Sequence, residues 1–255
     1  MLLLIVYQAW KEDRLDLAEH MFNKAGPLRK NLNADYSEKL ADVLYEIGSS
    51  LSAKQDFAMA VKWLERASDL FNDQIIELLS REGVELRMTI LQAKVSALLG
   101  LNTVDGYERA SSLVDYVESE VGTKPLVSLL KLDLLNKSPA ESFDCDAYAD
   151  VLRGMINTLS VSESTLKLLL HHIRKLHDKS PGIGCAVLDA FIHIVQRHHN
   201  DDWLGRLVIT RIWMTVNERD SNEMIDAARR LLSSLASPLP ADATVTVQAV
   251  SSLRL

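Results

Sequence analysis

A spacing that is specific to helices occurs twice in the first quarter of the chain. Each time, a small residue, a large residue and a second small residue lie at positions i, i+4 and i+7. The two triplets are Ala18, Phe22 and Ala25 and, 42 residues later, Ala60, Leu64 and Ala67. Each triplet forms one stripe along a helix. Because alanine lets a neighbouring helix backbone approach while the larger residue fills the groove between turns, we predict closely packed helices at both sites.

A second stripe precedes the second triplet and belongs to a separate helix. Leu44, Ile47, Gly48 and Leu51 lie at i, i+3, i+4 and i+7, and a side chain at Gly48 would collide with the partner helix. A helix with a small residue at mid-length, a short polar turn and a helix reading small, large, small form the tetratricopeptide pattern. We therefore predict an all-α fold, an α-solenoid of stacked antiparallel helix pairs, with these stripes as its packing positions.

Turn signals divide the chain into helix pairs. Glycine is favoured just after a helix and proline cannot continue one, so both mark boundaries. The predicted helices are 2–12 with 15–25, 36–53 with 56–71, 75–100 with 104–121, 124–136 with 144–159, two helices ending near 177 and 199, and 201–216 with 221–236. Small residues recur in the second helices at intervals typical of helical-hairpin repeats. No strand signal of any length accompanies them.

We predict one tetratricopeptide-like helical repeat array over residues 1–236 and an unstructured tail over 237–255. Helical periodicity stops after Ser237–Pro240, and almost no charge follows. The apolar start, residues 1–7, has neither the basic region nor the cleavage site of a signal peptide. It continues directly into Ala9 and Trp10, as the inner helix of a hairpin would. We therefore expect the array to be a piece of a longer one.

The composition limits the classes of partner. The 255 residues are 47% hydrophobic and carry a net charge of −7, so the chain can bury a core but lacks the overall basic charge that favours binding to a phosphate backbone. No apolar run approaches the ~20 residues of a membrane span. Cys145 and Cys185 lack a CxxC spacing and are expected to be reduced, half-buried thiols. We expect no direct nucleic-acid binding and no membrane.

No spacing in the chain predicts catalysis or a metal site. His171, His172 and His177 lie on one predicted helix, but their spacing points the rings in different directions, whereas zinc ligands on a helix typically lie at i and i+4. The acidic residues alternate with basic ones, as on a solvated helix face. There is no phosphate-binding loop and no nucleophile motif. We therefore expect no metal, no cofactor and no enzymatic activity.

The four tryptophans are candidates for core packing or for binding. Trp63 lies on the helix that carries Ala60 and Leu64, and we expect it to pack between repeats because aromatic bulk is mostly buried. For Trp203 and Trp213 the choice between packing and binding stays open.

Three blocks carry a resemblance to a known family. They are AEHMFNKA at 18–25, LYEIG at 44–48 and AVKWLERA at 60–67, preceded by Ala9-Trp10-Lys11. In this order they resemble the meiosis-specific tetratricopeptide scaffold family of the ZMM group, the fungal sporulation and synaptonemal complex assembly proteins. The similarity extends from about residue 9 to 157 and is thinner to about 235. The matching motifs are packing positions, so no functional residue of the family is carried over.

The resemblance implies a nuclear, chromosome-associated scaffold. Such proteins bind other proteins, here meiotic chromosome-axis or crossover factors, and support synaptonemal complex assembly and crossovers between homologous chromosomes. Two other classes stay open. A peptide-binding tetratricopeptide adaptor outside meiosis would carry Lys and Asn along the inner helices if it captured carboxylates, whereas the inner stripes here are Leu, Ile and Gly. An all-α enzyme would need convergent histidines or carboxylates.

Overall fold

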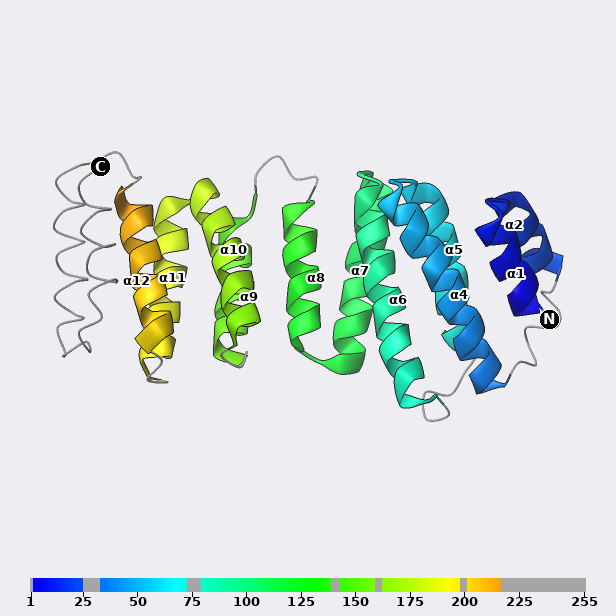
Figure 1. Ribbon diagram of the computed structural model, residues 1–255. Helices are drawn as coiled ribbons and strands as arrows, with labels where there is room; N and C mark the ends of the chain where they lie inside the picture. Colours follow the sequence, from blue (N-terminus) through cyan, green and yellow to red (C-terminus); the bar gives the residue numbers. More distant parts are fainter. Residues whose placement is uncertain are drawn as a thin grey trace. The chain divides into compact units, whose positions relative to one another are not determined.

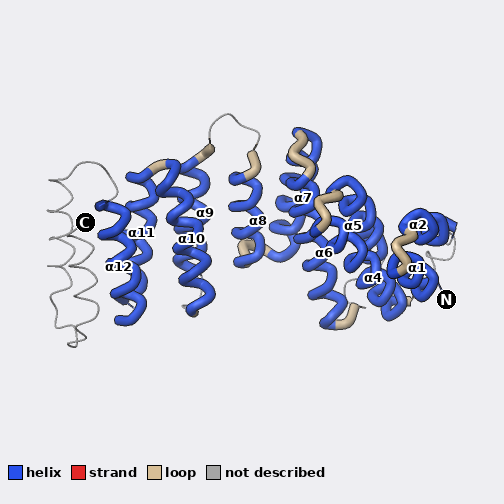
Figure 2. The backbone as a smooth tube through the Cα atoms, turned by 45° about the horizontal axis from the view of Figure 1, so that its top comes forward, coloured by secondary structure: helices blue, strands red, loops and turns tan. Residues whose placement is uncertain are grey.

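The described part of the chain is helical apart from short connections. The computed structural model describes residues 2–24, 33–72, 79–138, 143–158, 162–197 and 201–216. Within these ranges there are eleven α-helices and no strand, which confirms the predicted all-α class for these residues. The chain divides into two compact units, Met1–Pro139 and Ala140–Leu255, and each is described by itself (Figures 1 and 2).

The first unit contains seven of the described helices. They are α1 (Leu2–Lys11), α2 (Leu15–Lys24), α4 (Ala34–Ala53), α5 (Phe57–Asn72), α6 (Arg81–Gly100), α7 (Val104–Val121) and α8 (Pro125–Asn136). Most of the predicted bounds agree to within two residues. The helix predicted from residue 75 is the exception, because α6 begins only at Arg81. Its N-cap is Ser80, whose side chain accepts a hydrogen bond from the Gly83 amide.

Other helix starts follow the same local chemistry. The side-chain oxygens of Asn33 and Thr103 accept hydrogen bonds from the amides of Tyr36 and Gly106, which satisfies one of the amide groups that a helix start leaves unpaired. Helix α8 instead begins with Pro125, which needs no amide partner in the first turn. Short polar signals thus determine where these helices begin.

Three hairpin turns of the first unit share one backbone geometry. Each turn has three residues, and its central residue is left-handed, with φ of 58° at Asp13, 64° at Gln55 and 51° at Asn102. The central amide donates to a carbonyl of the preceding helix each time, to Trp10, Ser52 and Leu99 respectively. The helices on either side run in opposite directions (Figure 2). The turn is therefore a recurring structural unit, although only Asn and Asp among these residues commonly adopt this conformation.

Contacts in the first unit join neighbouring helices and every second helix. Helix α4 packs on α5, α5 on α6, α6 on α7 and α7 on α8, while α1 also contacts α4, α4 contacts α6 and α6 contacts α8. The link from α4 to α6 includes Glu38, whose carboxylate accepts hydrogen bonds from the Ser80 amide (2.7 Å) and hydroxyl (2.6 Å). A carboxylate at a helix N-terminus is also favoured by the helix dipole.

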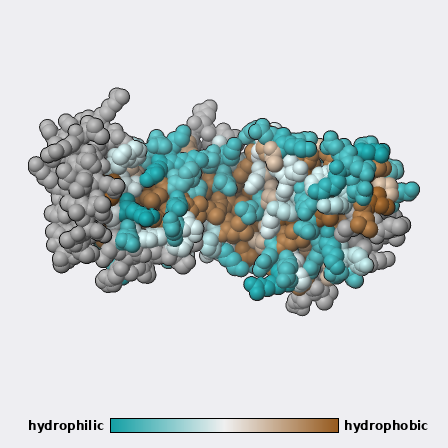
Figure 3. Space-filling view, in the orientation of Figure 1, coloured by the Kyte–Doolittle hydropathy of each residue, from teal (hydrophilic) through white to brown (hydrophobic). Residues whose placement is uncertain are grey.

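One hydrophobic cluster runs through the first unit. It extends from Val6 and Ala9 on α1 to Leu130 and Leu134 on α8 and includes the buried faces of the helices between them. The described hydrophobic residues of the stripes read from the sequence lie inside this cluster. In the view of Figure 3, hydrophilic side chains separate the hydrophobic residues that are exposed at the surface.

The second unit is described from Phe143 to Val216, with gaps. Its helices are α9 (Cys145–Thr158), α10 (Glu163–Lys179), α11 (Pro181–Arg197) and α12 (Asp201–Val216). Helix α11 contacts α9, α10 and α12. Helices α10 and α11 approach closely at Gly184, where a Cβ atom would lie 2.6 Å from the Cα atom of His177.

Several predictions concern residues or relations outside this description. The helix predicted over 221–236 and the tail over 237–255 lie outside the described residues. The predicted pair 124–136 with 144–159 corresponds to α8 and α9, which belong to different units. A single array over residues 1–236 therefore stays a prediction.

The left-handed turn generates a stability prediction. Gln55→Gly should raise the free energy of unfolding by up to about 1 kcal/mol, because a side-chain-bearing residue pays a steric cost at positive φ that glycine does not. Lys54→Gly is the matched control, since Lys54 has φ of −80° and glycine there should only add flexibility. Urea denaturation of both variants measures the difference. A Gln55→Gly protein that is less stable than Lys54→Gly would contradict the shared turn geometry.

Candidate functional site

The structure buries the predicted packing positions that it describes. These are Ala18, Phe22, Leu44, Ile47, Gly48, Leu51, Ala60, Leu64 and Ala67, while Ala25 lies outside the described residues. Burial is a condition for a packing role, and the role of these residues in a repeating stack stays a prediction.

Helices α4 and α5 approach each other closely at Gly48. A Cβ atom added there would lie 2.6 Å from Cγ of Leu64 and 3.4 Å from the carbonyl oxygen of Ala60. Leu64 and Ala60 are fully buried, so neither can move aside into solvent. The glycine thus permits a helix contact that other residues would widen.

Helix α5 also contacts the preceding hairpin through aromatic and charged groups. Trp63 is fully buried and its ring lies 6.2 Å from that of Phe22 on α2, so it packs between α5 and the preceding hairpin. The guanidinium of Arg66 stacks 4.7 Å from the Trp63 ring and hydrogen-bonds Glu19 of α2 at 2.7 Å. Hydrogen bonds from Lys62 and Arg66 lower the pKa of Glu19. The contact therefore combines apolar burial with a charged rim.

The described histidines do not form a metal site. No group of three His, Cys, Asp or Glu side chains in the described ranges could hold a metal ion. His171 and His172 are adjacent, with ring centroids 5.3 Å apart, and His193 is exposed on α11. His177 is buried in the last turn of α10, where its Nδ1 lies 3.8 Å from Sγ of Cys185. His198 and His199 are outside the described residues.

His172 is held neutral by its surroundings. Burial lowers the pKa of His172 to about 4, and the charges of His171 and Lys175 act in the same direction. Its Nδ1 atom lies 2.6 Å from the hydroxyl of Tyr148, a fully buried residue of α9. A neutral ring in this hydrogen bond links α9 to α10.

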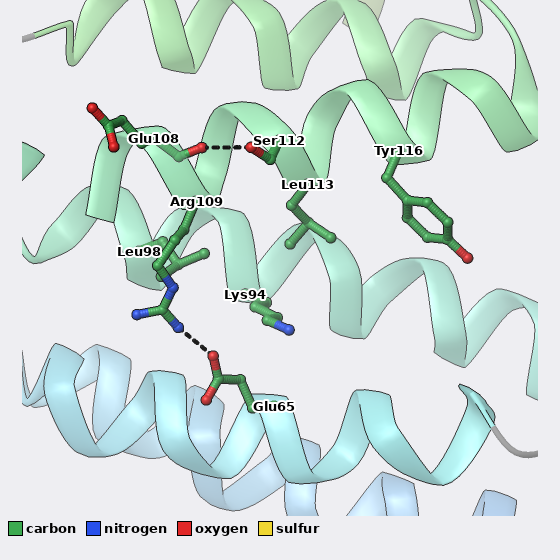
Figure 4. Close-up of a pocket in the computed structure, with 8 residues that line it drawn as sticks. All are labelled: Glu65, Lys94, Leu98, Glu108, Arg109, Ser112, Leu113 and Tyr116. Atoms are coloured by element: carbon green, nitrogen blue, oxygen red, sulfur yellow. Dashed lines mark hydrogen bonds and ion pairs between the residues drawn. The ribbon is translucent and has the colours of Figure 1, made fainter. Parts of the chain in front are cut away.

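A surface groove lies where α5, α6 and α7 meet, and we call it the α5–α7 groove. Its volume is about 500 Å³. Figure 4 shows the Arg109–Glu65 ion pair at one end, Tyr116 at the other and Lys94 between them. The lining residues are Glu65, Lys94, Leu98, Glu108, Arg109, Ser112, Leu113 and Tyr116. The groove combines apolar and charged side chains, as binding sites commonly do.

Ion pairs fix the two ends of the α5–α7 groove. Arg109 pairs with Glu65 of α5 and, at 3.4 Å, with Asp105. At the other end Arg87 of α6 binds Glu120 at 2.8 Å, and the Tyr116 hydroxyl hydrogen-bonds the same carboxylate. The hydrogen bond that Arg87 donates to Glu120 lowers the pKa of Glu120. The hydrogen bond between the Tyr116 hydroxyl and Glu120 raises the pKa of Tyr116. These pairs hold α7 against α5 and α6.

The sequence patterns did not indicate this groove. Its residues come from three helices, and only the three-dimensional register brings Glu65 to Arg109, 44 positions later. The available local signal is the alternation of acidic and basic residues, which is typical of a solvated helix face. No described helix is both long and apolar enough to cross a membrane.

Comparison with known protein families gives a match. A family model described as "meiosis protein SPO22/ZIP4 like" matches residues 8–250 of the chain. The matched range includes all three sequence blocks that carry the resemblance to a meiotic family, which is thereby confirmed. No curated protein and no solved structure matches the chain.

The close contact at Gly48 generates a paired prediction. Gly48→Ala should lower the free energy of unfolding by about 1 kcal/mol, because the cost of overpacking Leu64 exceeds the gain in helix propensity. Gly154→Ala is the control, since nothing lies within 4 Å of a Cβ atom there, and it should stabilise by about 1 kcal/mol. Thermal and urea melts test both. Equal gains at the two positions would show that α4 and α5 do not meet at Gly48.

The buried histidine generates a prediction of pH dependence. The unfolded chain binds a proton at His172 below pH 6.5, whereas the folded chain resists it down to about pH 4. The contribution of the neutral ring is therefore complete above pH 6.5 and is lost as the pH falls toward 4. Denaturation across this window should show a shallower loss of stability for His172→Gln than for the wild type. His193→Gln, at an exposed ring, should follow the wild type; parallel curves for all three proteins would refute the prediction.

Proposed function

The chain belongs to the SPO22/ZIP4-like family of meiosis proteins, and from this premise we propose that it is a non-catalytic scaffold for other proteins in meiosis. In this role it supports synaptonemal complex assembly and the formation of crossovers between homologous chromosomes. The family match over residues 8–250 is the observation that carries the proposal.

The scaffold role is supported by the way the helices pack. We propose that α1 with α2, α4 with α5 and α6 with α7 are tetratricopeptide-like pairs stacked as a solenoid. The shared left-handed turn and the contacts of α1 with α4 and α4 with α6 support this arrangement. Stacked repeats expose an extended surface that binds partners at several points. The buried stripe residues would then set the spacing of the pairs.

The proposal that the protein is not an enzyme rests on its side-chain arrangement. In the described ranges the partly buried arginines are ion-paired across helices, as Arg66 is with Glu19 and Arg87 with Glu120. Such pairs stabilise helix packing and provide neither a nucleophile nor a general base. Binding, rather than turnover, is the activity that these surfaces support.

The proposed partners are proteins of the meiotic chromosome axis or crossover machinery, and the proposed location is the nucleus, on chromosomes. The family match supports a role in meiosis. The net charge of −7 favours protein contacts over extended contacts with a nucleic-acid backbone.

Deletion of the gene in the source organism tests the function. We expect fewer crossovers and incomplete synapsis, with no loss of a measurable enzymatic turnover. Genetic map distances and staining of synapsed chromosomes measure the two effects. Normal crossover numbers with normal synapsis would refute the scaffold role and favour an adaptor outside meiosis.

Two alleles on α5 separate a packing defect from a surface change. Ala60 is fully buried, whereas Ala58 is exposed. Ala60→Leu should overpack the α4–α5 contact, cost about 1–3 kcal/mol and reduce crossovers. Ala58→Leu adds the same atoms at the surface and should leave both stability and crossovers close to wild type. Equal crossover numbers in the two strains would show that this packing is not needed for function.

A further inference from the structure

Lys94 in the α5–α7 groove differs from the other partly buried basic residues of the first unit, because it forms no ion pair with a carboxylate of the described residues. Three of the partly buried basic side chains of the first unit each bind a carboxylate of another helix: Arg66 binds Glu19 at 2.7 Å, Arg87 binds Glu120 at 2.8 Å and Lys131 binds Glu118 at 2.6 Å. Lys94 on α6 is also half-buried, yet no carboxylate of the described residues lies within ion-pair distance of its ammonium.

Of the two acidic residues that line the groove, one is engaged in an ion pair and the other is exposed to solvent. Glu65 binds Arg109, which closes one end of the groove. Glu108 is exposed, and its backbone carbonyl accepts the hydrogen bond from Ser112. Lys94 therefore presents a charged donor to the groove between the two fixed ends, as Figure 4 shows. A half-buried cation gains more from a bound anion than a fully solvated one does.

The wall beside Lys94 is apolar. Leu113 of α7 is half-buried and lines the groove, whereas Leu98, one turn further along α6, also borders it but is only 1% exposed. The ring of Tyr116 closes the other end and is 43% exposed, so it offers the type of aromatic surface that is enriched at binding hot spots. A ligand that fits must place an anionic group at Lys94 and an aliphatic group against Leu113.

We propose that the α5–α7 groove binds a segment of a partner protein in which an aspartate or glutamate side chain stands next to an aliphatic residue. The carboxylate accepts a hydrogen bond from the Lys94 ammonium, and the aliphatic side chain packs on Leu113. This inference rests on the proposed function as a protein-binding scaffold and specifies one surface of it.

The charges of the groove favour a single carboxylate over a phosphate group. Glu65 and Glu108 balance Arg109 and Lys94, so the lining has no net charge. A phosphate group with two negative charges would find only the Lys94 ammonium to bind it, and it would be repelled by the carboxylates of Glu65 and Glu108 more strongly than a single carboxylate would. A volume of about 500 Å³ is in the range of sites that enclose a few side chains.

A random peptide library displayed on phage and selected against the full chain tests the proposal. We expect the selected peptides to share an Asp or Glu next to Leu, Ile or Val. Fluorescence anisotropy with one synthetic selected peptide then measures affinity. Lys94→Met keeps the apolar stem but loses a charge-assisted hydrogen bond, so it should weaken binding by about tenfold. Lys94→Glu also introduces a like charge and should weaken binding by more than tenfold.

Controls keep a folding defect from imitating the result. Lys124→Glu changes an exposed lysine outside the groove and should bind as the wild type does. A peptide with Asn in place of Asp or Gln in place of Glu should lose the same affinity without any change to the protein. Raising the salt concentration should weaken the wild-type interaction and have little effect on Lys94→Met.

The outcomes distinguish this proposal from the proposed function. No enriched peptides, enriched peptides without an acidic residue, or binding that is unchanged by Lys94→Glu would each overturn the groove proposal, whatever the deletion strain shows. Peptides that bind through Lys94 combined with normal crossovers in the deletion strain would support the groove and refute the meiotic role.

Discussion

Helix α5 can contact α4 closely only because Gly48 has no side chain, and this contact orients the other faces of α5. Leu64 fills the space opposite Gly48. With that face turned to α4, Trp63 points to α2 and Glu65 to α7. A rotation of α5 that relieved a larger residue at position 48 would move both of these contacts. One small residue therefore influences the packing on both sides of the hairpin.

The ion pairs of the first unit stabilise the same contacts between helices as its apolar core does. Glu19 with Arg66, Glu65 with Arg109 and Arg87 with Glu120 each join different helices. Their carboxylates and guanidinium groups lie at the rims of buried contacts, where water screens them less than on an open surface. The pairs favour one register of helix against helix, while burial supplies most of the stability.

Helix positions could be read from the chain because their signals are local. Stripes at i, i+4 and i+7 and the glycine and proline turn signals lie within a few positions of the features they determine. The late start of α6 was missed although Ser80 with the amide of Gly83 forms its cap. The left-handed turn at Gln55 had no signal, since glutamine does not favour that conformation.

The groove could not be predicted because its character depends on pairs formed across helices. Whether Lys94 has a carboxylate partner is decided by where Glu65 and Glu108 point, and Glu65 is 44 positions from its partner Arg109. Spacing along one helix contains no such information. The link from Tyr148 to His172 is similar, because it joins side chains of α9 and α10 that lie 24 positions apart in the sequence.

The pattern of helix contacts also bears on how the chain reaches its fold. The main contacts of each unit join a helix to the next one or to the one after it, so few of them require the ends of a long loop to meet. Closing short loops costs little entropy, and chains dominated by such local contacts cross their folding barrier quickly. The three-residue turns lower that cost further. Each hairpin can therefore form while the rest of the chain is still being synthesised, and it then serves as the template on which its neighbour settles.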